Sequence, residues 1–113
     1  MSNCLFCKIV NKTLTAKIKF ENDSFIAIHD INPQAPTHLL VISKKHIAKI
    51  SETKKSDAEL LGAMVVLAQE LARQEGIEDG FRLVFNNGEK AGQSVFHIHL
   101  HVLGGRKMTW PPG

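Results

Sequence analysis

Three histidines alternate with apolar residues near the end of the chain. Residues 97–103 read HIHLHVL. In a β-strand, alternate side chains share one face and lie roughly 6.6 to 6.8 Å apart, so a strand here would align His97, His99 and His101. Imidazole is a good nucleophile when neutral, and its ordinary pKa of about 6.5 keeps it mostly neutral at pH 7. The pattern therefore favours attack by a histidine on a phosphoryl group, giving a phosphoramidate that water then splits.

Two other interpretations of the histidine run stay open at this point. Imidazole is the commonest metal ligand, and His-x-His on a strand can hold zinc. A packing role on a half-buried sheet would suit one such histidine but does not account for three in strict alternation. The polar loop over residues 86–94 favours phosphate chemistry, because its backbone N–H groups, the Gln93 amide and the Ser94 hydroxyl can all donate to phosphate oxygens.

The only two cysteines, Cys4 and Cys7, have the C-x-x-C spacing of half a zinc site. A disulfide framework needs more cysteines. A redox pair would need a thioredoxin-like strand and helix around it, and the sequence does not offer them. By itself, half a zinc site is weak evidence for a metal.

These side chains need a sheet to position them, and the sequence predicts about five strands. Strands are expected over 16–21 and 24–30, with Asn22-Asp23 as the turn, and over 38–42, 81–85 and 94–103. Two prolines within residues 32–36 interrupt the chain between the second and third strands. Residues 4–10 form a short apolar opening of one or two helical turns. In the last strand Phe96, Ile98, Leu100 and Val102 are expected on the core face, opposite the histidines.

One long helix is expected over residues 56–75. Ser56 is predicted to cap it, Glu59 to complete a capping box, and Gly76 to end it. Leu60, Met64, Leu67 and Leu71 form its apolar stripe, flanked by Leu61, Val65 and Ala68. The stripe indicates packing on a sheet rather than a cofactor role. The fold class is therefore α+β: an antiparallel sheet with one long helix on one face.

Composition narrows the class of protein. With 113 residues, 43% hydrophobic and 22% charged, the chain suits one soluble globular domain. We expect a cytoplasmic protein, since the sequence shows neither a signal peptide nor a run long enough to span a membrane. The net charge of +3 tolerates an anionic substrate. Scattered lysines without interleaved aromatic residues argue against a nucleic-acid partner.

The motifs together resemble the histidine triad (HIT) nucleotide-binding family, in particular its Hint branch. The HIHLHVL run matches the family signature in which three histidines alternate with apolar residues. Residues 30–38 (DINPQAPTH), 92–95 (GQSV) and the ending GGRKMTWPPG also match, so the resemblance covers nearly the whole chain. It implies a single HIT-like domain over residues 1–113, and a homodimer whose sheets join across the interface.

The same resemblance implies hydrolysis of purine nucleoside phosphoramidates, in which adenosine monophosphate (AMP) is bound to an amine. His99 would be the nucleophile that forms a nucleotidyl-histidine. His101 and Ser94 would contact the phosphate, with Gln93, Val95 and Asn86 close by, and His38 would support them. Asp30 would accept from the ribose hydroxyls, as an acceptor-only carboxylate can. The apolar slot for the base would be lined by Phe6, Ile9, Ile28, His29, Ile31 and Leu40. The Trp110 tail would reach toward the partner subunit's site; otherwise it anchors a terminal segment.

Zinc-carrying members of the family complete the cysteine half-site with two histidines, here His46 and His97. The resemblance therefore implies a possible structural zinc on Cys4, Cys7, His46 and His97, and no cofactor for the chemistry itself. Three alternatives stay open: a nucleotide-sensing or scaffold module, a dinucleoside polyphosphate hydrolase, and a metalloenzyme that uses the triad as ligands. Nucleotidyl transferases of the family carry glutamine at the third histidine, so His101 favours water as the acceptor.

Overall fold

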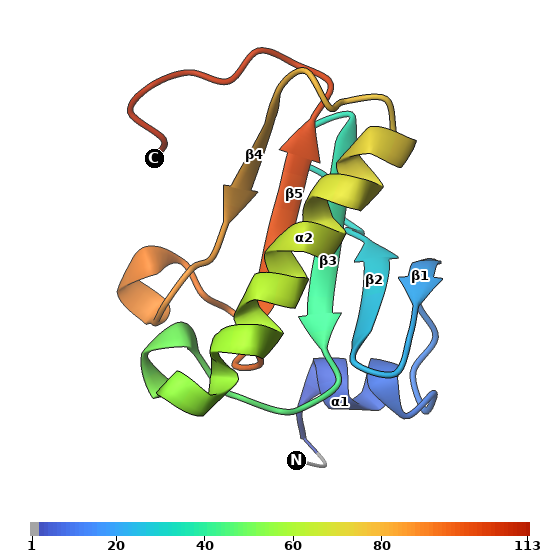
Figure 1. The fold of residues 1–113 in the computed structure, drawn as a ribbon, viewed down its shortest axis with the longest axis vertical. Helices are drawn as coiled ribbons and strands as arrows, with labels where there is room; N and C mark the ends of the chain where they lie inside the picture. Colours follow the sequence, from blue (N-terminus) through green and yellow to red (C-terminus); the bar gives the residue numbers. More distant parts are fainter. Residues whose placement is uncertain (1–2) are drawn as a thin grey trace.

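The computed structural model describes residues 3–113. Five strands form one antiparallel sheet, as predicted, and their order in the sheet is β1-β2-β3-β5-β4 (Figure 1). The strands are β1 (Ile18–Glu21), β2 (Phe25–His29), β3 (Thr37–Ser43), β4 (Phe81–Val84) and β5 (His99–Gly104). The helices are α1 (Leu5–Val10), α2 (Ala58–Gln74) and the short 3-10 turns η1 (Ile50–Glu52), η2 (Lys55–Asp57) and η3 (Glu89–Ala91).

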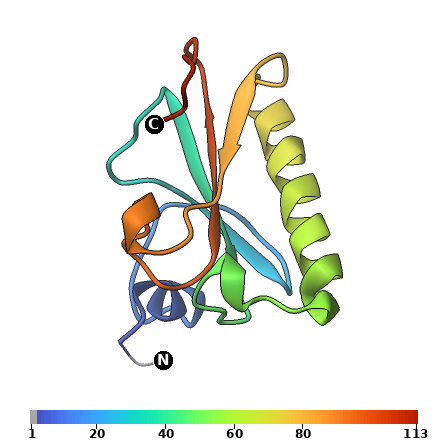
Figure 2. The same ribbon diagram turned by 90° about the vertical axis from the view of Figure 1, so that its left-hand side faces the viewer.

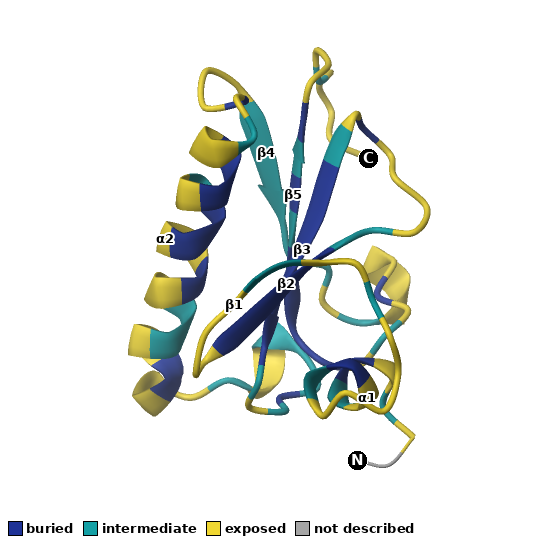
Figure 3. Ribbon diagram, turned by 90° about the vertical axis from the view of Figure 1, so that its right-hand side faces the viewer, coloured by how far each residue is buried: buried dark blue, intermediate teal, exposed yellow. Residues whose placement is uncertain are grey.

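The long helix α2 covers one face of the sheet, and α1 with η3 lies on the other (Figure 2). The side of α2 toward the sheet is buried and its outer side is exposed (Figure 3). Met64, Leu67, Ala68 and Leu71 pack there against a core that includes Leu39, Val41, Ile98, Leu100 and Val102. A smaller apolar cluster on the α1 face contains Phe6, Ile9, Ile26, Ile28, Leu40 and Ile42. Strand β3 is thus buried on both faces and is the fixed element against which β5 is registered.

The predicted start of the long helix was wrong. The helix begins at Ala58, after η2, and neither Ser56 nor Glu59 caps it. Instead Asp57 Oδ2 accepts a hydrogen bond from the Lys54 backbone N–H at 2.9 Å. This bond belongs to the turn η2, so the residues before Ala58 form a separate 3-10 turn rather than the first turn of the helix. Val65, expected beside the apolar stripe, is exposed.

The last strand begins five residues later than predicted, at His99 instead of Ser94. Strand β3 ends at Ser43, and its last pairing with β5 joins Ile42 to His99. Upstream of His99 the chain leaves the sheet, and the Ile98 N–H donates to the Ile47 carbonyl at 2.8 Å. His97 therefore lies outside the regular strand, although its ring stays on the α1 side of the sheet, where the Phe6 ring packs against both His97 and His99. Phe96, expected in the core, is 42% exposed for the same reason.

The other boundaries differ by one or two residues. Strand β1 begins at Ile18 rather than Ala16, β2 and β4 are each shorter than predicted, and β3 extends by one residue at each end. Among residues 3–113, no helix combines the length and the apolar character that crossing a bilayer requires.

Candidate active site and metal centre

A cavity of about 440 Å³ opens on the α1 face of the sheet. This volume falls in the range of small-molecule sites. Strand β5 supplies His99 and His101, strand β2 supplies Ile28 and His29, and α1 supplies Leu5, Phe6 and Ile9. The remaining lining residues are Leu14, Thr15, Ala16, Asp30, Ile31, Leu40, Ser94 and Val95.

The structure brings most of the predicted site residues to this cavity. All six residues expected in an apolar slot line it, although Ile31 is 99% exposed. Leu5, Leu14, Thr15 and Ala16 were missed. Leu5 was visible only as part of an apolar opening, and Ala16 only as the first residue of a predicted strand. Leu14 and Thr15 lie in an irregular segment without periodicity, so no sequence signal pointed to them.

Gln93 and Asn86 do not line the cavity. The buried Gln93 side chain holds the loop together instead. Its amide nitrogen donates to the carbonyls of Ala48 at 2.8 Å and Val95 at 3.1 Å, and its Oε1 accepts from the Gly88 N–H. Both amide hydrogens are thereby committed to the backbone. Gly88 and Gly92 adopt positive φ angles of 87° and 93° on either side of η3, which favours glycine at both turns. Gln93 thus positions Ser94 rather than facing the cavity.

One ring nitrogen of His99 is unprotonated and carries a free lone pair. Its Nδ1 lies 2.7 Å from the His97 carbonyl, which can only accept, so Nδ1 carries the proton and Nε2 is unprotonated. The side chain is 9% exposed. Burial lowers the pKa of His99, while the bond to the His97 carbonyl and the charge of Asp30 oppose the shift. The ring is therefore neutral at neutral pH, and its Nε2 is available as a nucleophile.

His101 presents the opposite character, a ring N–H. The Gln34 backbone N–H donates to His38 Nδ1 at 3.0 Å, which leaves the His38 proton on Nε2. His38 Nε2 lies 2.9 Å from His101 Nδ1 and donates to it, so His101 carries its own proton on Nε2. Burial, together with the neighbouring His99 and His38, lowers the pKa of His101 to about 4. His101 is a neutral donor beside His99, with 5.0 Å between the ring centroids.

Asp30 lies at the junction of the cavity and this histidine chain. One carboxylate oxygen is 3.4 Å from His38 Nε2, and the other accepts from the Asn32 N–H at 2.8 Å. Burial lowers the pKa of His38, and the charge of Asp30 opposes that shift. Asp30 lines the cavity while it fixes the turn that precedes β3.

A second cluster gathers Cys4, Cys7, His46 and His97. One donor atom from each lies within 4.8 Å of every other. His97 Nδ1 is 3.3 Å from Cys4 Sγ and 3.1 Å from His46 Nδ1, and Cys7 Sγ is 3.2 Å from His46 Nδ1. Tetrahedral zinc with ordinary bond lengths would separate two nitrogens by about 3.3 Å and a nitrogen and a sulfur by about 3.6 Å.

The protonation of His97 also fits a cation. Its Nε2 lies 2.6 Å from the Ser43 carbonyl and donates to it, so the Nδ1 lone pair faces the sulfur atoms. Such a hydrogen bond on the far nitrogen is typical of metal-bound histidine. Burial, and then the neighbouring Cys4, raise the pKa of the Cys7 thiol. Zinc must therefore displace a proton to bind. The donor set and its spacing fit a structural zinc ion, and these four residues can hold one.

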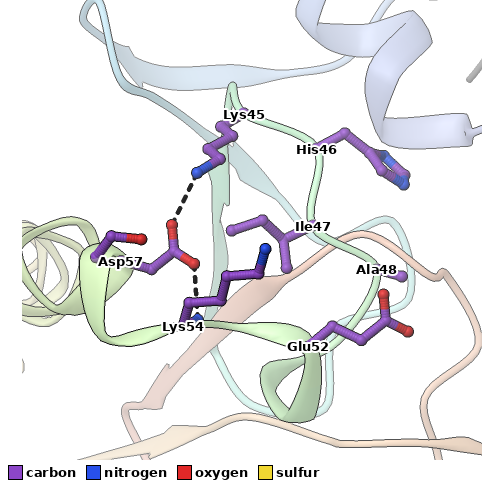
Figure 4. Close-up of a pocket in the computed structure, with 8 residues that line it drawn as sticks. Lys45, His46, Ile47, Ala48, Glu52, Lys54 and Asp57 are labelled. Atoms are coloured by element: carbon purple, nitrogen blue, oxygen red, sulfur yellow. Dashed lines mark hydrogen bonds and ion pairs between the residues drawn. The ribbon is translucent and has the colours of Figure 1, made fainter.

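Another cavity, of about 460 Å³, lies beside His46 but is built differently (Figure 4). Lys45 and Asp57 face one another across it with 2.8 Å between Nζ and Oδ1, while the His46 ring points away from them. The hydrogen bond from Lys45, together with that from the Lys54 backbone, lowers the pKa of Asp57. Because Lys45 and Asp57 are paired with one another, we assign this ion pair to securing the start of α2 rather than to a ligand.

Comparison with known proteins agrees with the fold. Residues 11–108 match the HIT domain family. A HIT family hydrolase from Legionella pneumophila has 54% sequence identity and a TM-score of 0.97, over 98% of this chain and 100% of that one. A 14 kDa zinc-binding protein of Zea mays is 44% identical over 99% of this chain and 89% of its own length. A zinc-bound histidine triad family protein from Mycobacterium smegmatis has 34% identity and a TM-score of 0.80, over 93% of this chain and 76% of that one.

The chain therefore belongs to the HIT family.

Proposed function

We propose that this protein is a hydrolase of the Hint branch that cleaves the P–N bond of purine nucleoside phosphoramidates through a nucleotidyl-His99 intermediate. The observation that carries the proposal is the pair of ring nitrogens on β5. His99 offers an unprotonated Nε2, and His101 offers an N–H donor beside it. A nucleophile and a donor for the phosphoryl oxygens are the two groups that phosphoryl transfer to a histidine requires.

In the first step the His99 Nε2 lone pair forms a bond to phosphorus. The P–N bond breaks, and the amine leaves with its electron pair and takes up a proton at the open side of the cavity. The ring now carries positive charge, because Nδ1 keeps its proton. The His97 carbonyl, 2.7 Å from Nδ1, and the nearby Asp30 carboxylate stabilise this charge. Because this charge develops only during the attack, the two groups stabilise the transition state more than the ground state, which lowers the activation barrier.

In the second step water attacks the phosphorus and the bond to Nε2 breaks. The products are AMP and a neutral His99, and the water proton is released. His101 Nε2–H and the Ser94 hydroxyl donate to the phosphoryl oxygens in both steps. His38 keeps His101 in the required tautomer. We place the base among Phe6, Ile9, Ile28, His29, Ile31 and Leu40, the ribose hydroxyls on Asp30, and Val95 near the phosphate.

For Cys4, Cys7, His46 and His97 we propose a structural zinc ion. The zinc-binding relative from Zea mays and the zinc-bound protein from Mycobacterium smegmatis support this assignment. The ion would stabilise the fold around α1 and would take no part in bond cleavage. Because His97 Nδ1 is a ligand and its Nε2 is bonded to Ser43, His97 has no free nitrogen for acid or base catalysis.

We also propose a homodimer that acts in the cytoplasm, where the two thiols stay reduced. Strand β4 lies at one edge of the sheet and can pair with the same strand of a second copy. Val65, Val66, Phe96 and Trp110 are exposed apolar side chains that such a contact can cover. Sedimentation equilibrium would measure the mass; a monomer at micromolar concentration would contradict this part of the proposal.

The substrate class is tested by comparing two substrates on one enzyme preparation. We expect kcat/KM for adenosine 5′-phosphoramidate to exceed that for diadenosine tetraphosphate by at least about 100-fold, equivalent to about 2.7 kcal/mol. A preference for the polyphosphate would assign the chain to dinucleoside polyphosphate hydrolysis. Tight AMP binding with turnover of neither substrate would indicate a nucleotide-sensing module.

A further inference from the structure

Helix α1 belongs to both clusters at once. It is six residues long, with Cys4 just before it and Cys7 inside it, so two of the four metal-binding residues fix its position. Leu5, Phe6 and Ile9 of the same helix form one wall of the nucleotide cavity. A helix this short is not stable by itself, so the wall depends on what anchors it.

His97 connects the metal-binding cluster to the nucleophile. Its Nδ1 faces the cysteines, and its own carbonyl accepts the proton of His99 Nδ1. The Phe6 ring packs edge-on against both imidazoles, with centroids 6.1 Å from His97 and 4.9 Å from His99. A displacement of α1 or His97 would therefore reach the nucleophile through two contacts.

The residues after His46 hold the remaining parts of the site. The Ile47 carbonyl accepts from the Ile98 N–H at 2.8 Å, directly before β5. The Ala48 carbonyl accepts from the Gln93 amide at 2.8 Å, directly before Ser94. The cavity wall and His99 are thus tied to residues of the metal-binding cluster, and the phosphate loop is tied to Ala48, two residues after His46.

We propose that zinc and nucleotide bind cooperatively: zinc on Cys4, Cys7, His46 and His97 orders the nucleotide cavity, and a nucleotide in the cavity strengthens zinc binding. This inference rests on the proposed function, because it requires a nucleotide in the 440 Å³ cavity. Without the metal, nucleotide binding must itself order α1 and lose part of its free energy to that step. The coupling is reciprocal, so each ligand changes the affinity of the other by the same factor.

The coupling is measured on the whole chain by competition for zinc with a chelating dye at fixed pH. With saturating AMP, we expect the Kd for zinc to fall by about 5- to 150-fold, and zinc to lower the Kd for AMP by the same factor. Ribose 5-phosphate reaches the phosphate and ribose positions without the base that contacts α1. It should therefore give a smaller factor. A zinc Kd that stays within about twofold when AMP is bound would overturn the proposal.

Two further measurements use metal-loaded protein, so they still test the proposal if the zinc-free chain does not fold. In protein loaded with Co²⁺ in place of zinc, AMP should shift the visible d–d absorption of the metal; unchanged bands with AMP bound would also overturn the proposal. Phe6→Leu keeps the ligands but loses the ring contacts to His97 and His99, so the coupling factor should fall toward one. Lys8→Ala, an exposed change on the same helix and outside the cavity, should keep it. Equal factors in both variants would contradict the assigned path.

The outcomes separate this inference from the proposed function. If AMP does not bind to zinc-loaded protein, both fail. If the phosphoramidate is hydrolysed through His99 while zinc does not bind, or binds with an affinity that AMP leaves unchanged, only the cooperativity fails.

Discussion

The two histidine clusters of this protein use the same side chain in opposite ways. In the metal-binding cluster, His97 donates from Nε2 to the Ser43 carbonyl and turns the Nδ1 lone pair toward two thiols. In the cluster that lines the 440 Å³ cavity, His99 donates from Nδ1 to the His97 carbonyl, and its Nε2 lone pair is left for the cavity. Only one residue separates them in sequence. In each ring, the nitrogen bonded to a backbone carbonyl keeps its proton, and the other nitrogen can react. The course of the backbone where the chain enters β5 therefore determines which nitrogen that is.

The largest expected effect comes from removing the nucleophile. His99→Ala should lower turnover of adenosine 5′-phosphoramidate by about 10⁴-fold or more, because no other group can form the nucleotidyl intermediate. Zinc content should stay at the wild-type value, since His99 is not a ligand. Steady-state kinetics and metal analysis measure the two properties on one sample. If His99→Ala turned over the substrate within tenfold of the wild-type rate, His99 would not be the nucleophile, and the two clusters would not differ in the way described.

The second effect comes from breaking the other cluster. Cys7→Ser should weaken zinc binding by at least about 100-fold, because a serine hydroxyl is a poor substitute for a thiolate. The lost binding free energy should lower Tm by about 10 °C when zinc is saturating for the wild type. Calorimetry measures the shift. Lys8→Ala, an exposed change on the same helix, is the control and should leave both properties unchanged. A Cys7→Ser variant with wild-type zinc affinity would contradict the assignment.

The third effect tests the tautomer of His101. His38→Ala removes the donor to His101 Nδ1 and should lower kcat by about 10- to 100-fold, less than the loss of a direct oxyanion donor costs. His38→Gln supplies an amide N–H and should recover most of the loss. KM should change little in either variant. If glutamine and alanine have the same effect, His38 does not act as a donor.

The smallest effect is on stability at acidic pH. The pKa of His101 is about 4 in the folded chain, against 6.5 ordinarily, so between these values the unfolded chain binds more protons. The contribution of His101 to stability is complete above pH 6.5 and is lost as pH falls toward 4. His101→Gln should therefore show a smaller decrease in Tm over this range, measured at equal zinc content. A parallel pH profile in the variant would contradict the lowered pKa.

Much of the architecture follows from sequence pattern, but the local breaks do not. Alternation and turn residues identified all five strands, and the apolar period identified the long helix. The same alternation, extended through residues 94–98, predicted five residues of strand that the structure does not have. The strand starts later because β3 ends at Ser43 and the Ile98 N–H bonds to the Ile47 carbonyl instead, a long-range contact that no local pattern encodes.

The site could be predicted to a similar depth. The resemblance to the histidine triad family named the residues that line the cavity on β2 and β5, together with the four metal-binding residues. It could not show that the Gln93 amide bonds to the loop backbone, because the acceptors are the Ala48 and Val95 carbonyls, 45 and 2 residues away in the chain. It also missed Thr15 and Ala16, which reach the cavity only because an irregular segment passes its mouth.

The central claim is that the His99 Nε2, and no other nitrogen, attacks phosphorus. Rapid acid-free quenching of a single turnover with adenosine 5′-phosphoramidate, followed by peptide mass spectrometry, tests it directly. We predict the added mass of one adenylyl group on His99, absent from the His99→Ala variant. An adenylyl group on His97, His101 or His38, or hydrolysis without any protein-bound adenylyl group, would contradict the account.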